Sequence, residues 1–210
     1  MTIYAIPGLG ADERVFKHLS LKVTPLQWIT PKIRESLESY VQQLIAQIDT
    51  SEAFLLIGVS FGGMVAVEMA KYITPQKIII ISSAATKDEL PRAVGIARRS
   101  GIIRMIPGFL LKPPTFLAYW FFGVKRKGSK RLLKKIIKDT DVKFLKWAIN
   151  KIVCWENKDI PDNLTRIHGN KDRLLKMDEA LKYEVIKEGG HFMIVDQAEE
   201  INRIIEKHMG

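Results

Sequence analysis

Uninterrupted runs of hydrophobic residues recur along this chain and predict buried strands. Ala53 to Ile57 and Lys77-Ile-Ile-Ile-Ile-Ser82 lack the alternation of a strand with one wet face, so each should be covered on both sides. Thr2 to Ile6 predicts a first strand of the same kind, and Leu164–His168 and Tyr183–Ile186 predict two more near the C-terminal end. These runs favour a sheet in the middle of the molecule.

Other segments predict an edge strand and the helices that pack on the sheet. Leu21 to Trp28 reads as a second strand. Pro25 within it predicts an edge position, because proline has no backbone N–H and cannot donate a hydrogen bond to a neighbouring strand. Between Ile33 and Ile48 the apolar positions 33, 37, 40, 41, 44, 45 and 48 form a helical stripe. Met64 to Tyr72 and Phe192 to Lys207 predict further helices.

Strands that alternate with helices predict an α/β fold with a doubly wound, mostly parallel sheet of about six strands. With strands numbered as they occur, the expected order is 2-1-3-4-5-6, which leaves the Pro25 strand at an edge. The winding then reverses between strands one and three, and ligands bind beyond the carboxyl ends of strands at such a point. Those two ends carry Pro7-Gly-Leu-Gly10 and Ser60.

From Thr86 to Asn157 the alternation of strand and helix stops, and the sequence becomes helical with breaks at prolines and glycines. We predict a helical lid, residues 86–157, inserted after the fourth strand of a core formed by residues 1–85 and 158–210. The core is expected to fold without this lid. Some of its aromatic residues should pack it together and others should line an apolar acyl pocket: Phe109, Phe116, Tyr119, Trp120, Phe121, Phe122, Phe144 and Trp147.

The positive charge is concentrated in the same segment. The chain has a net charge of +10, and residues 86–157 hold 17 basic and 5 acidic residues, a net charge of +12. Lys125 to Lys138 reads as a basic amphipathic helix. The preferred interpretation of its charged side is a solvated face. The alternative is a contact for an acidic carrier protein or an anionic lipid surface. No nucleic-acid partner is expected, because nothing resembles a base-reading module.

Length and composition narrow the class of protein. A chain of 210 residues with these apolar and charged fractions fits one globular domain. Neither a leader peptide nor a transmembrane segment is expected, since no apolar run approaches the ~18 residues of a membrane span. Cys154 is alone, so we expect a small core residue, no disulfide and no metal site. A cytoplasmic protein without a cofactor is the expectation.

Gly58-Val-Ser-Phe-Gly62 is the first candidate for chemistry. This G-x-S-x-G lies between a buried strand and a helix, where a sharp turn lifts the hydroxyl of Ser60 clear of the backbone. The N-terminal amides of the following helix point back toward that hydroxyl. Glycine and serine are common in ordinary turns, but the strand before and the helix after favour a nucleophile.

A serine nucleophile needs a base, and a base needs an orienting acid. His191 lies in the loop after the last strand, at the catalytic end of the sheet, with two glycines before it. The other histidines favour structural or solvated roles: His18 in the first crossover, His168 as a packed or surface residue, and His208 near the C-terminal end.

The acid is expected in the loop after the fifth strand, which Asp172 occupies alone. Asp88, after the fourth strand, is the alternative. Asp162 lies at the wrong end of the sheet, and Asp196 is expected to cap the final helix. The chain order of Ser60, Asp172 and His191 is the order of nucleophile-elbow hydrolases.

Three motifs resemble those of the α/β-hydrolase fold superfamily, over residues 2 to the C-terminal end. Gly58-Val-Ser-Phe-Gly-Gly63 resembles its nucleophile elbow, His168-Gly-Asn-Lys-Asp172 its acid loop and Gly189-Gly-His-Phe192 its histidine loop. Pro7-Gly-Leu-Gly10 resembles the oxyanion loop, although that loop usually begins His-Gly. The resemblance implies that the backbone N–H groups of Leu9 and Phe61 bind the oxyanion. The hairpin that usually precedes the first strand is missing.

These features predict a serine hydrolase that cleaves a carboxylic ester or thioester of a small to medium apolar acyl group, carried by a small molecule or by a carrier. Two alternatives use the same residues. One is a ligand receptor that keeps the triad, and the other is a cofactor-free lyase or C–C hydrolase. The motifs alone do not separate these chemistries, because one fold hosts all of them.

Overall fold

Six strands form a single sheet in the computed structural model, which describes residues 1–101 and 106–209 except for the side chain of Phe109. The order is β2-β1-β3-β4-β5-β6 and every neighbouring pair is parallel, which confirms the predicted topology. The strands are β1 (Thr2–Ile6), β2 (Thr24–Pro25), β3 (Phe54–Val59), β4 (Lys77–Ile81), β5 (Leu164–Gly169) and β6 (Glu184–Ile186).

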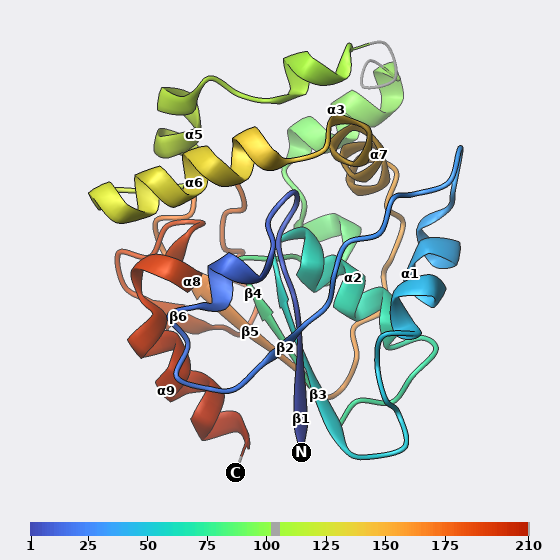
Figure 1. The fold of residues 1–210 in the computed structure, drawn as a ribbon, viewed down its shortest axis with the longest axis vertical. Coiled ribbons are helices and arrows are strands. Elements are labelled where there is room, and N and C mark those ends of the chain that lie inside the picture. The colour runs from blue at the N-terminus through green and yellow to red at the C-terminus, as the bar shows by residue number, and fades with distance from the viewer. Residues whose placement is uncertain (102–105, 210) are drawn as a thin grey trace.

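Helices flank both faces of this sheet and cover one end of it (Figure 1). Those that pack on the faces are η1 (Glu13–Phe16), α1 (Leu37–Ile45), α2 (Phe61–Met69), α8 (Met193–Asp196) and α9 (Ala198–Met209). Between β4 and β5 the chain forms η2 (Lys87–Glu89), α3 (Arg92–Ser100), η3 (Gly108–Leu111), α5 (Thr115–Phe121), α6 (Lys127–Asp139) and α7 (Val142–Val153). We call residues 86–157 the helical insertion.

Two hydrophobic cores lie on the two faces of the sheet, because alternate residues of each strand point to opposite sides. Ile3 and Ile57 contribute to the core beneath η1, α8 and α9, whereas Tyr4 and Leu56 contribute to the core beneath α1 and α2. The middle strands β3 and β4 are buried on both faces, as their apolar runs predicted.

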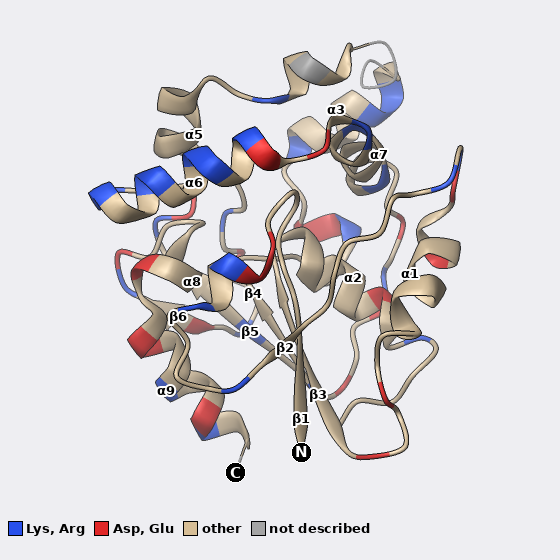
Figure 2. Cartoon of the chain, in the orientation of Figure 1, with Lys and Arg blue, Asp and Glu red and all other residues tan. Residues whose placement is uncertain are grey.

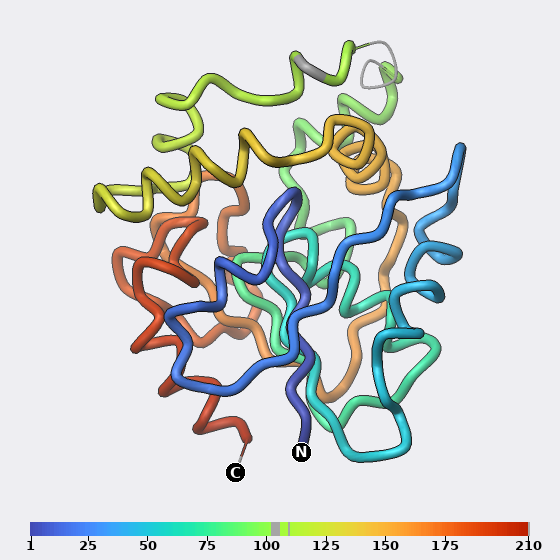
Figure 3. The backbone as a smooth tube through the Cα atoms, viewed as in Figure 1, coloured from blue at the N-terminus to red at the C-terminus, as the bar shows by residue number. Residues whose placement is uncertain are grey.

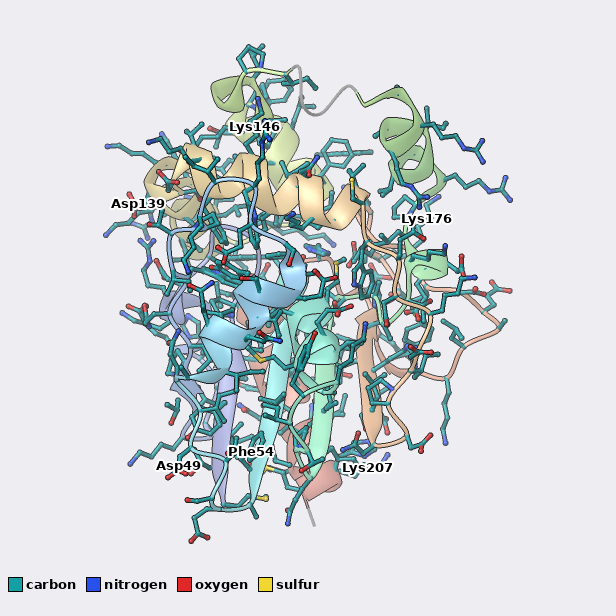
Figure 4. The ribbon with its side chains drawn as sticks, turned by 90° about the vertical axis from the view of Figure 1, so that its right-hand side faces the viewer. Asp49, Phe54, Asp139, Lys146, Lys176 and Lys207 are labelled. Atoms are coloured by element: carbon teal, nitrogen blue, oxygen red, sulfur yellow. The ribbon has the colours of Figure 1, made fainter. Side chains whose placement is uncertain are left out.

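The carboxyl ends of the strands point toward the helical insertion (Figure 1). Both termini lie at the other end of the molecule (Figure 3). That end also carries Asp49, Phe54 and Lys207, whereas Lys146 lies at the end formed by the insertion (Figure 4). The insertion therefore covers the edge where parallel α/β sheets bind ligands.

Three predicted elements differ most from their expected form in the structure. The second strand is reduced to two residues, Thr24–Pro25, at the edge that Pro25 predicted. Helix α1 begins at Leu37 and not at Ile33, because Ser36 caps it by accepting a hydrogen bond from Ser39 N at 3.1 Å. The last predicted helix is divided into α8 and α9 at Gln197, which has a non-helical φ of −132°.

The two ends of the insertion are tied to each other. Asn157 donates its Nδ2–H to Ala85 O at 2.7 Å, and Lys87 donates its N–H to Asn157 O at 2.9 Å. These contacts fall at the positions where the sequence pattern changes.

The insertion also completes the core of the molecule. Phe144 of α7 lies 5.2 Å from Trp28, and Trp147 lies 4.3 Å from Tyr40, measured between ring centroids. Just beyond α7, Trp155 donates its indole N–H to the buried carboxylate of Glu68 at 2.7 Å. Removing the insertion would uncover these aromatic rings, and whether the core folds without it stays a prediction for unfolding measurements.

Cys154 is exposed, and its prediction as a core residue is wrong. It occupies the C-cap of α7, where the chain leaves the helix between buried Val153 and buried Trp155. The helical burial pattern ends at this residue, so its side chain turns outward. Within the part of the chain that the structure describes, no helix has the length and apolar character needed to cross a bilayer.

Candidate active site

Ser60 occupies the sharp turn between β3 and α2. Its backbone has φ 53° and ψ −121°, a conformation that costs a non-glycine residue energy and persists only where surrounding contacts hold it. The turn is held by hydrogen bonds from Ser60 N to Ile81 O at 2.9 Å and from Ser83 Oγ to Ser60 O at 2.6 Å. Neighbouring strand ends thus fix the side chain at the carboxyl edge of the sheet.

Glycine is required on both sides of this serine because the backbones pack closely. A Cβ atom on Gly62 would overlap the carbonyl oxygens of Ile6 and Pro7, and one on Gly58 would overlap the backbone of Gly62 and Gly63. These are backbone obstacles, which cannot move aside as a flexible side chain can. The G-x-S-x-G pattern therefore reflects a packing requirement.

The three side chains expected to act together are brought together. His191 Nε2 lies 2.9 Å from Ser60 Oγ, and His191 Nδ1 lies 2.7 Å from Asp172 Oδ2. A carboxylate only accepts hydrogen bonds, so Nδ1 carries the proton in neutral His191. Nε2 then presents its lone pair to the hydroxyl of Ser60, as a general base requires.

Asp172 is buried and held from several sides. Its Oδ1 accepts hydrogen bonds from the backbone N–H groups of Leu174 at 2.8 Å and Leu175 at 3.0 Å. Burial acts to raise the pKa of Asp172, but adjacent His191 and hydrogen bonds from His168, His191 and Leu175 outweigh it. The net effect lowers the pKa of Asp172 well below its ordinary value, so the group is a carboxylate at neutral pH.

His168 is a second imidazole beside this carboxylate, a contact that the sequence did not predict. Its Nε2 lies 2.8 Å from Leu175 O and 3.4 Å from Asp172 Oδ2. A carbonyl oxygen cannot donate, so Nε2 carries a proton that points toward both oxygens. The available signal was its position in the His168-to-Asp172 loop, four residues before the acid.

Glycines also let the histidine loop reach Ser60. The backbone of Gly190 packs against Gly123 and the carbonyl of Phe122, with no room for a Cβ atom. Phe192 N donates to Phe122 O at 3.1 Å, and the ring of Phe122 lies edge-on to the imidazole of His191 at 5.3 Å. The insertion therefore supports the histidine directly.

The two amides expected to bind an oxyanion lie beside Ser60. The N–H groups of Leu9 and Phe61 find no acceptor within the described part of the chain. Phe61 is the first residue of α2, and Leu9 and Ser60 line the same cavity. Such free amides are available to a ligand.

The loop of Leu9 is supported even though Pro7 replaces the usual histidine. Trp28 Nε1 donates to Gly8 O at 3.3 Å, and Ala11 N donates to the same oxygen at 2.9 Å. Thr140 of the insertion contacts Gly10 O with its hydroxyl at 3.1 Å. Trp28 and Thr140 were not singled out in the sequence, since both are distant from the loop along the chain.

A cavity of about 340 Å³ adjoins Ser60 and His191. Its wall is formed mainly by aliphatic side chains, including Leu133 and Ile136 of α6 and Leu145 of α7. Among the aromatic residues of the insertion whose side chains are described, Phe122 alone lines it. The prediction of an apolar pocket is therefore met by aliphatic residues, and Phe109 lies outside the described side chains.

Most of the alternative site residues lie elsewhere. Asp88 and Asp162 are exposed, as is His18. Asp196 accepts a hydrogen bond from Ser129 Oγ at 2.5 Å, which links α8 to α6. His208 is not free in solvent, because its Nε2 lies 2.7 Å from Glu184 Oε1. None of these contacts involves Ser60.

No three His, Cys, Asp or Glu side chains in residues 1–101 and 106–209 lie close enough together to hold a metal ion. The chemical groups at the carboxyl edge of the sheet are thus a serine hydroxyl, a histidine with an oriented tautomer, a buried carboxylate and two free amides. This set can transfer a proton and stabilise an oxyanion beside an apolar cavity.

Comparison with known proteins identifies the class. Residues 3–204 match the alpha/beta hydrolase family, and the chain belongs to that family of hydrolases. No curated protein matches the sequence.

Several solved structures share the fold at low sequence identity. A thermophilic esterase from Thermogutta terrifontis is similar with a TM-score of 0.71 and 15% identity over 100% of this chain and 89% of that one. A lipase-esterase related protein from Clostridium acetobutylicum gives a TM-score of 0.71 and 16% identity, with 99% and 93% covered. YbtT, a type II thioesterase from a yersiniabactin biosynthetic pathway, gives 0.64 and 16%, with 99% and 92% covered.

Proposed function

We propose that this protein is a serine hydrolase that cleaves a carboxylic ester or thioester of a small to medium apolar acid through an acyl-enzyme. The observation that carries the proposal is the 2.9 Å contact between His191 Nε2 and Ser60 Oγ, with His191 Nδ1 at 2.7 Å from Asp172 Oδ2. The apolar cavity beside these groups suits an acyl chain.

The reaction would begin with attack of Ser60 Oγ on the acyl carbon while His191 Nε2 takes the hydroxyl proton. The charge that develops on the carbonyl oxygen would be bound by the amides of Leu9 and Phe61, each worth about 3 kcal/mol of barrier in serine hydrolases. His191 would then return its proton to the departing alcohol or thiol. A water molecule, deprotonated by His191, would attack the acyl-enzyme, and His191 would return this proton to Ser60 Oγ as the bond to Ser60 breaks and the acid is released.

Asp172 would act on His191 without touching the substrate. Its carboxylate accepts the Nδ1–H of His191, which fixes the tautomer and stabilises the imidazolium that forms when Ser60 loses its proton. The depressed pKa of Asp172 keeps this negative charge in place at neutral and mildly acidic pH.

The helical insertion would serve as the lid over this site and select the acyl group. Leu133 and Ile136 of α6 and Leu145 of α7 form much of the cavity wall and leave room for an aliphatic chain. Replacing Ile136 by Trp should shorten the chain that is accepted and leave attack on an acetyl ester in place, because Ile136 lines the cavity and is not a hydrogen-bond partner of Ser60, Asp172 or His191.

The test is a panel of p-nitrophenyl esters and acyl thioesters from two to twelve carbons, with β-diketones and lactones as further substrates. The proposal predicts repeated turnover of esters or thioesters with an initial burst of leaving group, absent in Ser60→Ala. A single slow turnover with the acyl group retained would instead indicate a receptor. Turnover confined to β-diketones would indicate a C–C hydrolase or lyase.

A further inference from the structure

Helix α5 has an apolar face that the described part of the chain leaves largely open to solvent. The four side chains on this face are exposed, with Phe116 at 70% and Trp120 at 54% of full accessibility: Phe116, Leu117, Trp120 and Phe121. Their spacing of i, i+1, i+4 and i+5 puts them on one side of a helix. Ala118, between them, is fully buried against the core. We call these four residues the α5 patch.

An edge-to-face ring pair and a cation–π contact fix the side chains of the patch. Trp120 and Phe121 pack edge to face with ring centroids 4.9 Å apart. The guanidinium of Arg173 lies 4.6 Å from the ring of Trp120 and donates from Nη1 to Trp120 O at 2.7 Å. Four contiguous apolar side chains, three of them aromatic, are unusual on a water-exposed helix, and such patches mark contact surfaces.

Basic residues border the α5 patch. Lys125 and Lys130 line a groove with Phe116 and Trp120, and Lys171 and Arg173 line the same groove. Figure 2 shows uncharged α5 alongside the row of basic residues on α6. In the groove the acidic residue is Glu188, which lies 3.8 Å from Lys171 and is paired with it.

We propose that the α5 patch and its basic border bind the surface of an anionic lipid bilayer. Aromatic side chains are favourable at the boundary between headgroups and acyl chains, and nearby Lys and Arg are attracted to anionic headgroups. A second copy of this chain is a poorer occupant, because a two-fold contact would bring the basic borders together and like charges across an interface oppose association.

The patch lies next to the candidate active site. Leu111, Lys112 and Pro113, just before α5, and Phe122, just after it, all line the cavity beside Ser60. A bilayer in contact with α5 would therefore lie beside the wall of the acyl cavity. The proposal does not depend on the reaction chemistry, since vesicle binding is measured without a substrate.

The test is co-sedimentation of the full chain with vesicles of phosphatidylcholine alone and of phosphatidylcholine with 40% phosphatidylglycerol. We expect binding to the anionic vesicles only. It should fall at least tenfold in F116S/W120S/F121S and, separately, in K125E/K130E, which reverses the two lysines that line the groove beside the patch. The matched control is Y72S/I160S, which removes two exposed apolar side chains outside the insertion and should bind as wild type does. All variants should keep wild-type melting temperatures and wild-type turnover of a water-soluble short ester.

Insertion of the aromatic side chains has a spectroscopic readout. Lipids brominated on the acyl chain should quench the emission of Trp120, and Trp120→Phe should lose this quenching while it still binds vesicles. Three results would overturn the proposal. They are no binding of wild type to anionic vesicles, wild-type binding by the aromatic variant, and a dimer in sedimentation equilibrium that the aromatic variant dissociates. Retention of an acidic carrier protein through α5, without vesicle binding, would likewise assign the surface to a protein.

Discussion

The imidazole of His168 lies against the carboxylate of Asp172, with Nε2 at 3.4 Å from the same Oδ2 atom that accepts the hydrogen bond of His191. Both side chains are almost completely buried, and the Nε2–H of His168 also donates to Leu175 O at 2.8 Å. His168 therefore helps to fix the acid loop relative to β5. It is a positioning residue, since it contacts neither Ser60 nor the cavity.

We expect His168→Leu to lower kcat on the order of tenfold with little change in KM, because a hydrogen bond to a charged group typically contributes 1.5–3 kcal/mol. His168→Gln should retain much of the activity, since its amide can donate from nearly the same position. Tyr183→Phe is the control, because it preserves the ring that packs against His168. Equal kcat in His168→Leu and wild type would show that His168 does not position Asp172 for the reaction.

Asp172, and not Asp88, should be the acid of the triad. Asp88 is exposed in η2, whereas Asp172 contacts His191 at 2.7 Å. Asp172→Asn should reduce turnover about ten-thousandfold, as loss of the acid does in other triads, and Asp88→Asn should change it less than twofold. Steady-state kinetics on one reactive ester measures both. If Asp88→Asn lost most of its turnover while Asp172→Asn kept nearly normal turnover, Asp88 would be the acid.

The lowered pKa of Asp172 also predicts how stability depends on pH. A carboxyl group with a folded-state pKa below its unfolded value of about 3.9 stabilises the fold above that pH, and the contribution is lost as the pH falls toward the folded-state value. The unfolding free energy of wild type relative to Asp172→Asn should therefore decrease from pH 5 to pH 2. Urea unfolding at several pH values measures it, and a constant difference would show that Asp172 is not stabilised as a carboxylate.

Part of this site could be predicted from the sequence because its signals are local. The buried runs gave the strand order, and the glycines around Ser60 reflect backbone contacts that only glycine permits. His191 and Asp172 follow strands whose carboxyl ends meet at one edge. Contacts between distant segments could not be predicted, such as Thr140 on Gly10 or the burial of Phe144 against Trp28.

The exposure and packing partners of individual side chains could not be predicted from the hydrophobic pattern either. The exposure of Cys154 depends on the last turn of α7, and the cavity is aliphatic because α6 and α7 turn their Leu and Ile residues toward Ser60. Among the aromatic residues of the same insertion whose side chains are described, Phe144 lies in the core, Phe122 lines the cavity and Trp120 lies in the α5 patch. Helical periodicity predicts that one face is buried, but not which partner it meets.

The part of the insertion that packs on the core should be required for stability. Phe144 is buried among Trp28, Tyr40 and Trp147, so Phe144→Ala should lower the unfolding free energy by about 3–5 kcal/mol. Phe121→Ala, on the exposed patch, should change it by less than about 0.5 kcal/mol. Urea unfolding compares the two. Similar unfolding free energies in both variants would indicate that the core does not need the insertion for its stability.

Ser60 is proposed as the covalent nucleophile, and labelling with a fluorophosphonate followed by mass spectrometry tests this role. Wild type should gain one phosphonyl group, and peptide mapping should place it on Ser60. His191→Ala should label far more slowly, because its imidazole no longer takes the proton, and Ser60→Ala should not be labelled at all. Undiminished labelling of Ser60→Ala, or an adduct on another residue in wild type, would show that Ser60 is not the nucleophile.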